Sequence, residues 1–329
     1  MFFSKKEKMT FITKVKIECS ILRDLISQIK LRGWIKAIRY SLVCSKLLWL
    51  GNRASYIQKH KMNLDFLSTH FHLSEDIPAS QPILSSAYKI WVLWWQGKEE
   101  MPEIVRATYN SIVRNSGKEV ILITRDNYRQ YIDIPDYIES KVAHGKMKLP
   151  ALSDFIRCSL LDKYGGMWID STILMASQPP SEIFDKQLFT IRSGINTKPL
   201  AGKYVAAGRW NVQILGTNRI HHPLFYQMRY LWMEYWSKYD SLIDYLLVDY
   251  TIARLYDMDL NIRHQIDHIE CSNPDMHGLL PLLDKPYDDK KRKELEEDTY
   301  LFKLTYKLKG ICDTSKKNTF YNKILEEWM

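Results

Sequence analysis

Short apolar runs alternate with amphipathic segments over residues 88–175. Residues 89–97 and 118–124 are apolar runs of strand length, closed by glycine or polar residues, which is typical of buried strands. Residues 101–115 lie between them and carry apolar positions at helical spacing. This strand–helix–strand order predicts a parallel sheet with right-handed crossovers.

A second helix–strand unit follows. Residues 149–166 have a helical apolar stripe that ends at a pair of glycines, and residues 167–175 form a further apolar run, which predicts another strand. Beyond residue 185, short strands mix with long aromatic-rich helices at 222–239 and 241–256. We therefore expect an α/β fold with a Rossmann-type, mostly parallel sheet flanked by helices and a helix-rich C-terminal part.

The N-terminal part of the chain has a different pattern. Residues 1–75 combine helical spacing with many basic positions, and the Ser- and Pro-rich stretch 74–88 marks a boundary. We expect a basic, amphipathic helical segment over 1–75 and a main domain over 76–329.

The positive charge of the chain lies in this N-terminal segment. Residues 1–62 hold fourteen Lys and Arg against three acids, which gives them a net charge of +11. Since the whole chain has a net charge of +9, the remaining residues carry a net charge of −2. A basic amphipathic helix is typical of an element that lies on an anionic membrane surface. The alternative is a helix packed on the main domain with a solvated basic face. Nucleic-acid binding ranks third, and we expect no such partner, because no recognition motif accompanies the charge.

Membrane-spanning and secreted classes are disfavoured. The segment has no apolar run near the roughly 20 residues that span a bilayer, and no signal-peptide core. The five cysteines are scattered and include no C-x-x-C pair, so neither a disulfide framework nor a zinc site is indicated. We expect reduced cysteines in the cytoplasm.

Three charged residues are predicted to meet at one edge of the sheet. Asp154 and Arg157 lie three apart on the helix at 149–166, so they share a face. Asp170 comes near the carboxyl end of the next strand, and that end lines the ligand crevice of open α/β sheets. Taken singly, each has a structural explanation: a helix acid, its ion-pair partner and a strand-end cap.

Together these residues carry a family resemblance. The sequence "IW", a helix, a strand, then S-D-x-x-R at 153–157 and Y-G-G-x-W-x-D at 164–170 resembles the nucleotide-sugar-binding core of glycosyltransferase family 32. More narrowly, it resembles the bacterial capsular polysaccharide synthesis branch, and it is similar to the glucosylating clostridial toxins and yeast initiating mannosyltransferases. The resemblance covers residues 88–180 well and 181–329 more loosely, where the acceptor site and the rest of the active site are expected.

The resemblance implies a GT-A fold, a nucleoside-diphosphate sugar as donor and retention of anomeric configuration. It implies that Trp91 stacks on the nucleobase, Asp154 holds sugar or ribose hydroxyls, and Arg157 reaches the donor sugar and phosphate. These roles suit an aromatic face, a carboxylate and a guanidinium. The donor-site residues expected within this core are Trp91, Ser153, Asp154, Arg157, Gly165, Gly166, Asp170 and Thr172, and Lys303 and Lys307 are the further donor-site candidates.

The sequence departs from the family at the metal site. Asp170 corresponds to the first acid of the family's D-x-D motif, but Thr172 stands where the second acid would bind a divalent ion. Asp170 is thus the one metal ligand expected, and dependence on Mn or Mg is left open. Lys303 and Lys307, four apart, would share a face if helical, and their ammonium groups could offset the diphosphate charge in place of a metal. A solvated basic stripe is the alternative.

Retaining transfer can also use a protein group near the anomeric carbon. In addition to Asp170 and Arg157, the candidates for this catalytic group are Asn211, Asp244 and Asp249.

The expected function is a cytoplasmic glycosyltransferase, peripheral on the inner face of a bacterial plasma membrane. It would transfer a hexose, with galactose as one candidate, from a donor such as a UDP sugar to a lipid-linked glycan acceptor in capsule or surface polysaccharide synthesis. The alternatives are a catalytically inactive sugar-nucleotide-binding or scaffold protein and a protein-modifying glycosyltransferase. The oligomeric state is left open.

Overall fold

A five-stranded sheet in the order β3-β2-β4-β7-β6 forms the centre of the protein. The structure, a computed structural model, describes residues 11–193 and 202–329. Strands β2 (Lys89–Leu93), β3 (Glu119–Ile123) and β4 (Gly166–Ile169) run parallel, as predicted. Strand β7 (Ile214–Thr217) is antiparallel to β4 and to β6 (Phe189–Thr190), so the sheet as a whole is mixed.

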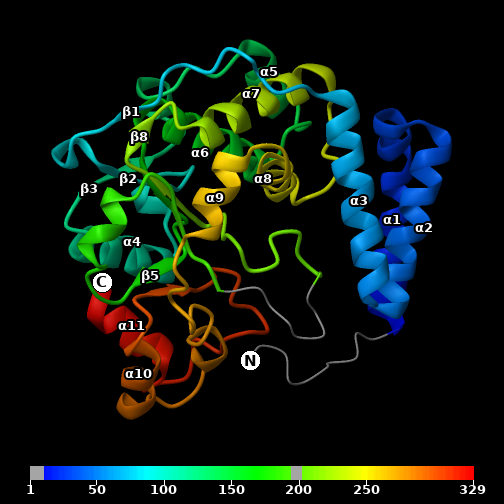
Figure 1. Cartoon of the computed structure of the whole chain (residues 1–329). Coiled ribbons are helices and arrows are strands. Elements are labelled where there is room, and N and C mark those ends of the chain that lie inside the picture. The colour runs from blue at the N-terminus through cyan, green and yellow to red at the C-terminus, as the bar shows by residue number, and fades with distance from the viewer. Residues whose placement is uncertain (1–10, 194–201) are drawn as a thin grey trace.

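Helices cover both faces of this sheet (Figure 1). Ile90 and Val92 of β2 pack in the core that includes α4 (Glu103–Asn115) and α11 (Phe320–Trp328). Trp91 and Leu93 point to the opposite core, built with α6 (Leu149–Tyr164), α7 (Pro223–Lys238) and α8 (Leu247–Met258). A strand buried on both faces needs apolar residues at successive positions, which is why residues 90–93 show no polar alternation. The α/β architecture expected of a GT-A-like domain is confirmed.

The apolar run 167–175 forms two strands rather than the single one predicted. Strand β4 ends at Ile169, the chain turns, and β5 (Ile173–Met175) pairs antiparallel with β9 (Leu301–Lys303). The Ile173 amide closes the turn by donating to the Asp170 carbonyl at 2.9 Å. The break therefore leaves Asp170 at the carboxyl edge of the sheet and brings residue 303 beside it.

The predicted N-terminal helices are present within the described residues. They are α1 (Phe11–Arg32), α2 (Trp34–Leu50) and α3 (Arg53–His70). Figure 1 shows α3 between the α1–α2 pair and the rest of the protein, and α3 packs on α8. Among the described residues, no helix is both long and apolar enough to cross a bilayer.

The remaining elements complete the layers and edges. They are β1 (Gln81–Pro82), which pairs with β8 (Arg219–Ile220), and the helices α5 (Asp136–Ala143), α9 (Leu260–Asp267) and α10 (Asp289–Glu296).

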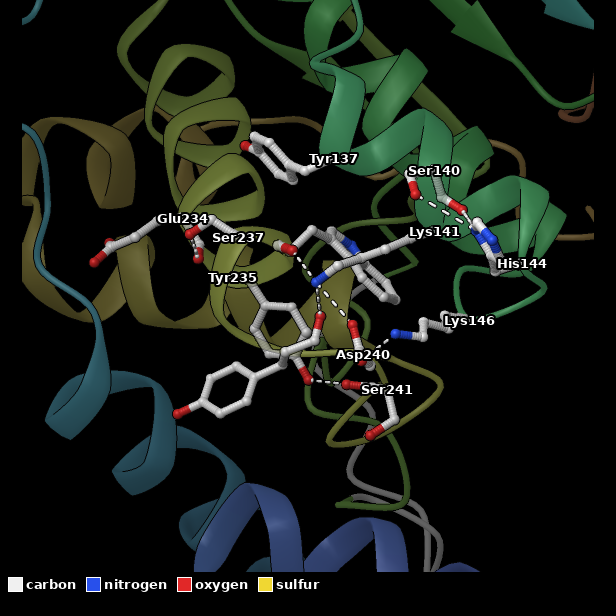
Figure 2. Close-up of polar contacts among 12 residues, drawn as sticks. Tyr137, Ser140, Lys141, His144, Lys146, Glu234, Tyr235, Ser237, Asp240 and Ser241 are labelled. Carbon is white, nitrogen blue, oxygen red and sulfur yellow. Dashed lines mark hydrogen bonds and ion pairs between the residues drawn. The ribbon is translucent and has the colours of Figure 1, made fainter.

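The loop at residues 239–246, between α7 and α8, is held in place by polar contacts (Figure 2). Lys141 of α5 donates to the Tyr239 carbonyl at 2.6 Å and pairs with the Asp240 carboxylate at 3.0 Å. The Tyr235 hydroxyl donates to the Ser241 carbonyl at 2.6 Å. This loop takes up residues that the sequence pattern assigned to the start of a helix at 241, and α8 begins only at Leu247.

Candidate functional site

Asp170 is surrounded by donors at the carboxyl edge of the sheet. Its backbone amide donates to the Gln213 carbonyl at 2.9 Å, which fixes the residue beside the start of β7. Its Oδ1 atom accepts from Trp168 Nε1 at 2.9 Å and from Arg157 Nη2 at 3.1 Å. The Lys303 ammonium lies 3.3 Å from Oδ2. The carboxylate is still 24% exposed, so it remains open to a ligand.

Arg157 links Asp170 to α6. Its side chain is only 6% exposed, its Nη1 atom lies 2.9 Å from Asp154 Oδ1, and its guanidinium lies over the Trp168 ring at 4.8 Å. A guanidinium that bridges two carboxylates and lies over an aromatic ring has little rotational freedom. The structure thus brings Asp154, Arg157 and Asp170 together, whereas what they bind stays a prediction. Ser153 precedes Asp154 on α6 and is half-buried.

Lys303 holds the position next to Asp170 and Thr172. Its Nζ atom donates to Thr172 Oγ1 at 2.6 Å as well as to Asp170 Oδ2. The pairing of β5 with β9 sets Lys303 opposite Ile173 and so determines this contact. Lys303 is therefore in a strand, so the condition under which Lys303 and Lys307 would share a helix face is not met. Lys307 is exposed, with its ammonium 5.8 Å from the centre of the Tyr306 ring.

The residues around Asp170 do not fit a divalent cation. A bound Mn or Mg ion needs several oxygen ligands, of which anionic ones bind best. Here Asp170 contributes one carboxylate, Thr172 a neutral hydroxyl, and Lys303 a positive charge between them. Over residues 11–193 and 202–329, no three His, Cys, Asp or Glu side chains are grouped as metal ligands.

Two carboxyl groups of the site have pKa values that are raised towards neutral pH. Burial raises the pKa of Asp154 to about 7; the Arg157 charge opposes the shift, while Asp170 and Asp249 add to it. Burial likewise raises the pKa of Asp249 to about 6, against the hydrogen bond from Trp210 Nε1 at 3.0 Å and the charge of Arg157. The predicted residue Asp249 therefore belongs to the same electrostatic cluster as Asp154 and Arg157.

The other two catalytic candidates have local structural partners. Asn211 lies in the segment before β7; its Oδ1 atom accepts from the Gln213 amide at 2.9 Å, and its Nδ2 atom contacts Met276 Sδ at 3.3 Å. It shapes the turn that binds the Asp170 amide. Asp244 lies elsewhere, in an ion pair with Lys59 at 2.6 Å and a hydrogen bond from the Tyr40 hydroxyl at 2.9 Å. It anchors the N-terminal helices, and its predicted catalytic role is not supported.

Trp91 cannot stack on a nucleobase in this structure. Its ring is fully buried, and its Nε1 atom donates to the Gly165 carbonyl at 2.8 Å. Gly165 and Gly166 lie at the start of β4, the end opposite Asp170, so their predicted donor-site role is not supported either. A Cβ atom at Gly166 would clash with the Lys89 carbonyl oxygen, and its φ of 86° favours glycine. Both glycines allow close strand packing.

Aromatic residues that the sequence pattern did not identify lie at the carboxyl edge of the sheet, the edge that holds Asp170. Trp94 directly follows β2, is half-buried and meets the Tyr306 ring edge-on at 5.5 Å between ring centres. Tyr306 comes three residues after Lys303. Tyr245 is 75% exposed, and partial desolvation, followed by the charges of Asp154 and Asp170, raises its pKa. The signal for Trp94 was its place at the carboxyl end of an apolar run, where side chains leave the core.

Residues 50–324 match the model of a family described as capsular polysaccharide synthesis protein. Among solved structures, the chain is similar to the apo structure of the WbbM bifunctional glycosyltransferase, at 12% identity and a TM-score of 0.37. That alignment covers 83% of this chain and 56% of the WbbM chain, so the protein spans little more than half of that structure's length. No curated protein matches the sequence.

The expected branch is thereby confirmed, whereas the wider assignment to glycosyltransferase family 32 and its D-x-D motif stays a prediction. The match includes Asp154, Arg157, Asp170 and Lys303, and it excludes α1 and nearly all of α2. Since it extends over most of the chain, the protein belongs to the capsular polysaccharide synthesis protein family.

Proposed function

We propose that the protein is a retaining glycosyltransferase that moves a hexose from a nucleoside-diphosphate sugar to a lipid-linked glycan acceptor. The observation that carries the proposal is the Asp170 carboxylate between two fixed cations, Arg157 and Lys303, at the carboxyl edge of an α/β sheet. A carboxylate suits sugar hydroxyls, and cations beside it suit a diphosphate. Family membership supports a role in building capsule or related surface polysaccharide.

In this proposal, different side chains bind different parts of the donor. Asp170 accepts hydrogen bonds from sugar or ribose hydroxyls, and Arg157 holds the Asp170 carboxylate in orientation. An ammonium group has three N–H donors, and Asp170 and Thr172 take two of those on Lys303, which leaves one for a phosphate oxygen. Charge on the leaving diphosphate is then offset by fixed cations in a partly buried site. Trp94 and Tyr306 offer the aromatic surface for the base.

Proton transfer is served by the raised carboxyl pKa values. A group that takes a proton from an acceptor hydroxyl must exchange protons near pH 7 and must be accessible to the acceptor. Asp154 meets both requirements, because its pKa is about 7 and its side chain is 17% exposed. Asp249 is more buried and is hydrogen-bonded to Trp210, so we assign it a positioning role.

A catalytically inactive donor-binding protein is the second candidate. Thr172 in place of an acid and Lys303 beside it favour this reading, because they remove the anionic ligands of a catalytic metal. The two candidates differ in turnover alone, since both require Asp170 and Arg157 for donor binding.

The test combines binding and turnover. Thermal unfolding of the purified protein with a panel of nucleoside-diphosphate sugars should identify a donor, because a ligand that binds the folded state raises its stability. Release of nucleoside diphosphate is then measured with and without a lipid-linked glycan acceptor. We expect turnover that falls about a hundredfold in Asp170→Asn. Donor binding without turnover would favour the second candidate, and wild-type turnover in Asp170→Asn would remove the site assignment.

A further inference from the structure

Helices α1 and α2 form a hairpin that is packed on the protein by one side only. Glu18 of α1 accepts from Trp49 Nε1 at 3.2 Å and also from the Ser45 hydroxyl, so the two helices lie antiparallel. On the inner side, Gln28 and Arg32 are buried near the C-terminal end of α1, and each donates to the Ile243 carbonyl at 3.4 Å. On α2, the inner side holds Ala37, Tyr40 and Ser41, all buried.

The opposite side of the hairpin, here called the outer face, is apolar and exposed. Its residues are spaced three, four or seven apart along each helix, so they share one face of that helix. They are between 39% and 72% exposed, although each is a large aliphatic side chain. The outer face consists of Val15, Leu22 and Ile26 of α1 and Ile35, Ile38 and Leu42 of α2.

Basic residues border this outer face. Lys16, Arg23 and Lys30 recur every seven residues along α1, and Arg39 and Lys46 are seven apart on α2. All five side chains are exposed. Over residues 11–50 the hairpin carries eight Lys and Arg against two acids. The hairpin therefore presents a band of aliphatic side chains with a row of positive charge along each helix.

We infer that the outer face docks on an anionic lipid surface, with its aliphatic side chains inserted among the acyl chains and its basic borders on the headgroup phosphates. Buried apolar area and attraction to anionic lipid are the two contributions that hold an interfacial helix on a membrane. A second copy of the chain fits less well, because the basic rows of two hairpins would face each other and repel. The inference does not depend on the proposed transferase activity.

The hairpin also contacts the loop at the rim of the candidate site. Besides the Ile243 carbonyl, the loop at 239–246 offers Asp244, which accepts from Tyr40 of α2 and pairs with Lys59 of α3. The next residue is Tyr245, whose pKa is raised by partial desolvation and by the charges of Asp154 and Asp170. A hairpin fixed on a membrane would thus hold this rim at a fixed orientation to the lipid. That arrangement suits an acceptor that is itself anchored in the bilayer.

Vesicle co-sedimentation of the full chain tests the inference. The probes are phosphatidylcholine vesicles with and without phosphatidylglycerol, and no donor sugar is needed. We expect binding to the anionic vesicles that weakens with added salt, because exposed charges are screened over about 8 Å at physiological ionic strength. Ile35→Ser with Leu42→Ser should weaken binding at least about tenfold through lost apolar burial. The matched control is Leu84→Ser with Leu260→Ser, two residues outside the hairpin that are more exposed than Ile35 and Leu42.

A second set of variants tests the charge. Replacing Lys30, Arg39 and Lys46 by Ala should weaken binding by about two orders of magnitude at low salt and flatten the salt dependence. The control replaces three exposed lysines elsewhere, Lys186, Lys290 and Lys317. Thermal unfolding confirms that each variant is folded. The inference would be overturned if wild-type protein did not co-sediment with anionic vesicles, or if the hairpin variants bound these vesicles as tightly as their controls. A wild-type dimer that Ile35→Ser with Leu42→Ser dissociates would assign the face to self-association instead.

Discussion

Lys303 and Asp170 are 133 positions apart in the sequence, yet Lys303 Nζ lies 3.3 Å from Asp170 Oδ2. The contact depends on the antiparallel pairing of β5 with β9, which carries Lys303 into the turn after β4. The same ammonium binds Thr172, the residue that stands in place of a second acid. A positive charge is thus fixed by the fold at the place where the resemblance to glycosyltransferase family 32 predicts a metal.

The first prediction follows from this contact. Lys303→Ala should lower turnover about a hundredfold, because a fixed charge that stabilises the leaving diphosphate is lost. Lys307→Ala is the matched control, since it removes an exposed lysine four residues on that does not contact Asp170, and it should remain near wild type. Added chelator should leave most of the activity. The measurement is the initial rate of nucleoside diphosphate release.

A manganese-reversible loss of all activity in chelator, with Lys303→Ala near wild type, would contradict this prediction. The ion would then be held by acids that the structure does not group at Asp170.

The second prediction concerns pH and Asp249. Its folded-state pKa of about 6 lies above the usual value near 4, so between pH 4 and 6 the folded protein binds a proton that the unfolded chain has released. Stability should therefore fall as the pH rises from 4 to 6, by up to about 3 kcal/mol for two pKa units. Asp249→Asn keeps an oxygen for the Trp210 Nε1 donor, carries no charge, and should flatten this part of the profile.

Chemical denaturation of both proteins from pH 4 to 8 measures the effect. Parallel profiles for wild type and Asp249→Asn would show that this carboxyl does not have a raised pKa.

The elements nearest the site could be predicted from the sequence because their signals are local. Helix α6 and strand β4 follow from apolar spacing and a glycine pair, and their order places Asp154, Arg157 and Asp170 at one edge. The choice between Trp91 and Trp94 was not available in the same way. In a strand buried on both faces, apolar residues occur at successive positions, so alternation does not separate the two tryptophans, and only the place of Trp94 at the end of the run distinguishes it.

The remaining errors come from contacts between distant segments. The run 167–175 is apolar at both ends, and its pairing with residues 301–303 makes the polar positions 170–172 a turn between two strands rather than the middle of one. The same pairing makes Lys303 part of a strand. Asp244 has the spacing of a helical residue, but the N-terminal helices bind it from the far end of the chain. Patterns within a single window contain no information about such partners.

The third prediction tests the structural role of Gly166. An alanine there would clash with the Lys89 carbonyl and adopt a φ of 86°, so Gly166→Ala should destabilise the fold by about 3 kcal/mol or more. Gly97→Ala is the control: its φ of 94° imposes similar backbone strain, but no atom lies within 4 Å of the added Cβ. The difference between the two free energies of unfolding isolates the clash between β2 and β4. Equal losses would argue against it.

The fourth prediction separates Asp244 from the candidate site. Burial opposes ionisation of Asp244, yet the Lys59 charge and the hydrogen bonds it receives hold its pKa below the usual value, which marks a carboxylate that stabilises the fold at neutral pH. Asp244→Asn should cost about 2 kcal/mol, less than a fully buried pair because Lys59 is 21% exposed. Turnover of a soluble donor, measured below the unfolding temperature, should stay within about twofold of wild type, since the residue touches the N-terminal helices rather than Asp170.

The loss of stability in Asp244→Asn should also shrink as the pH falls below the unfolded pKa near 4. The wild-type carboxylate is then protonated in the unfolded chain and contributes less to stability. A large drop in turnover with unchanged stability would return Asp244 to the catalytic candidates.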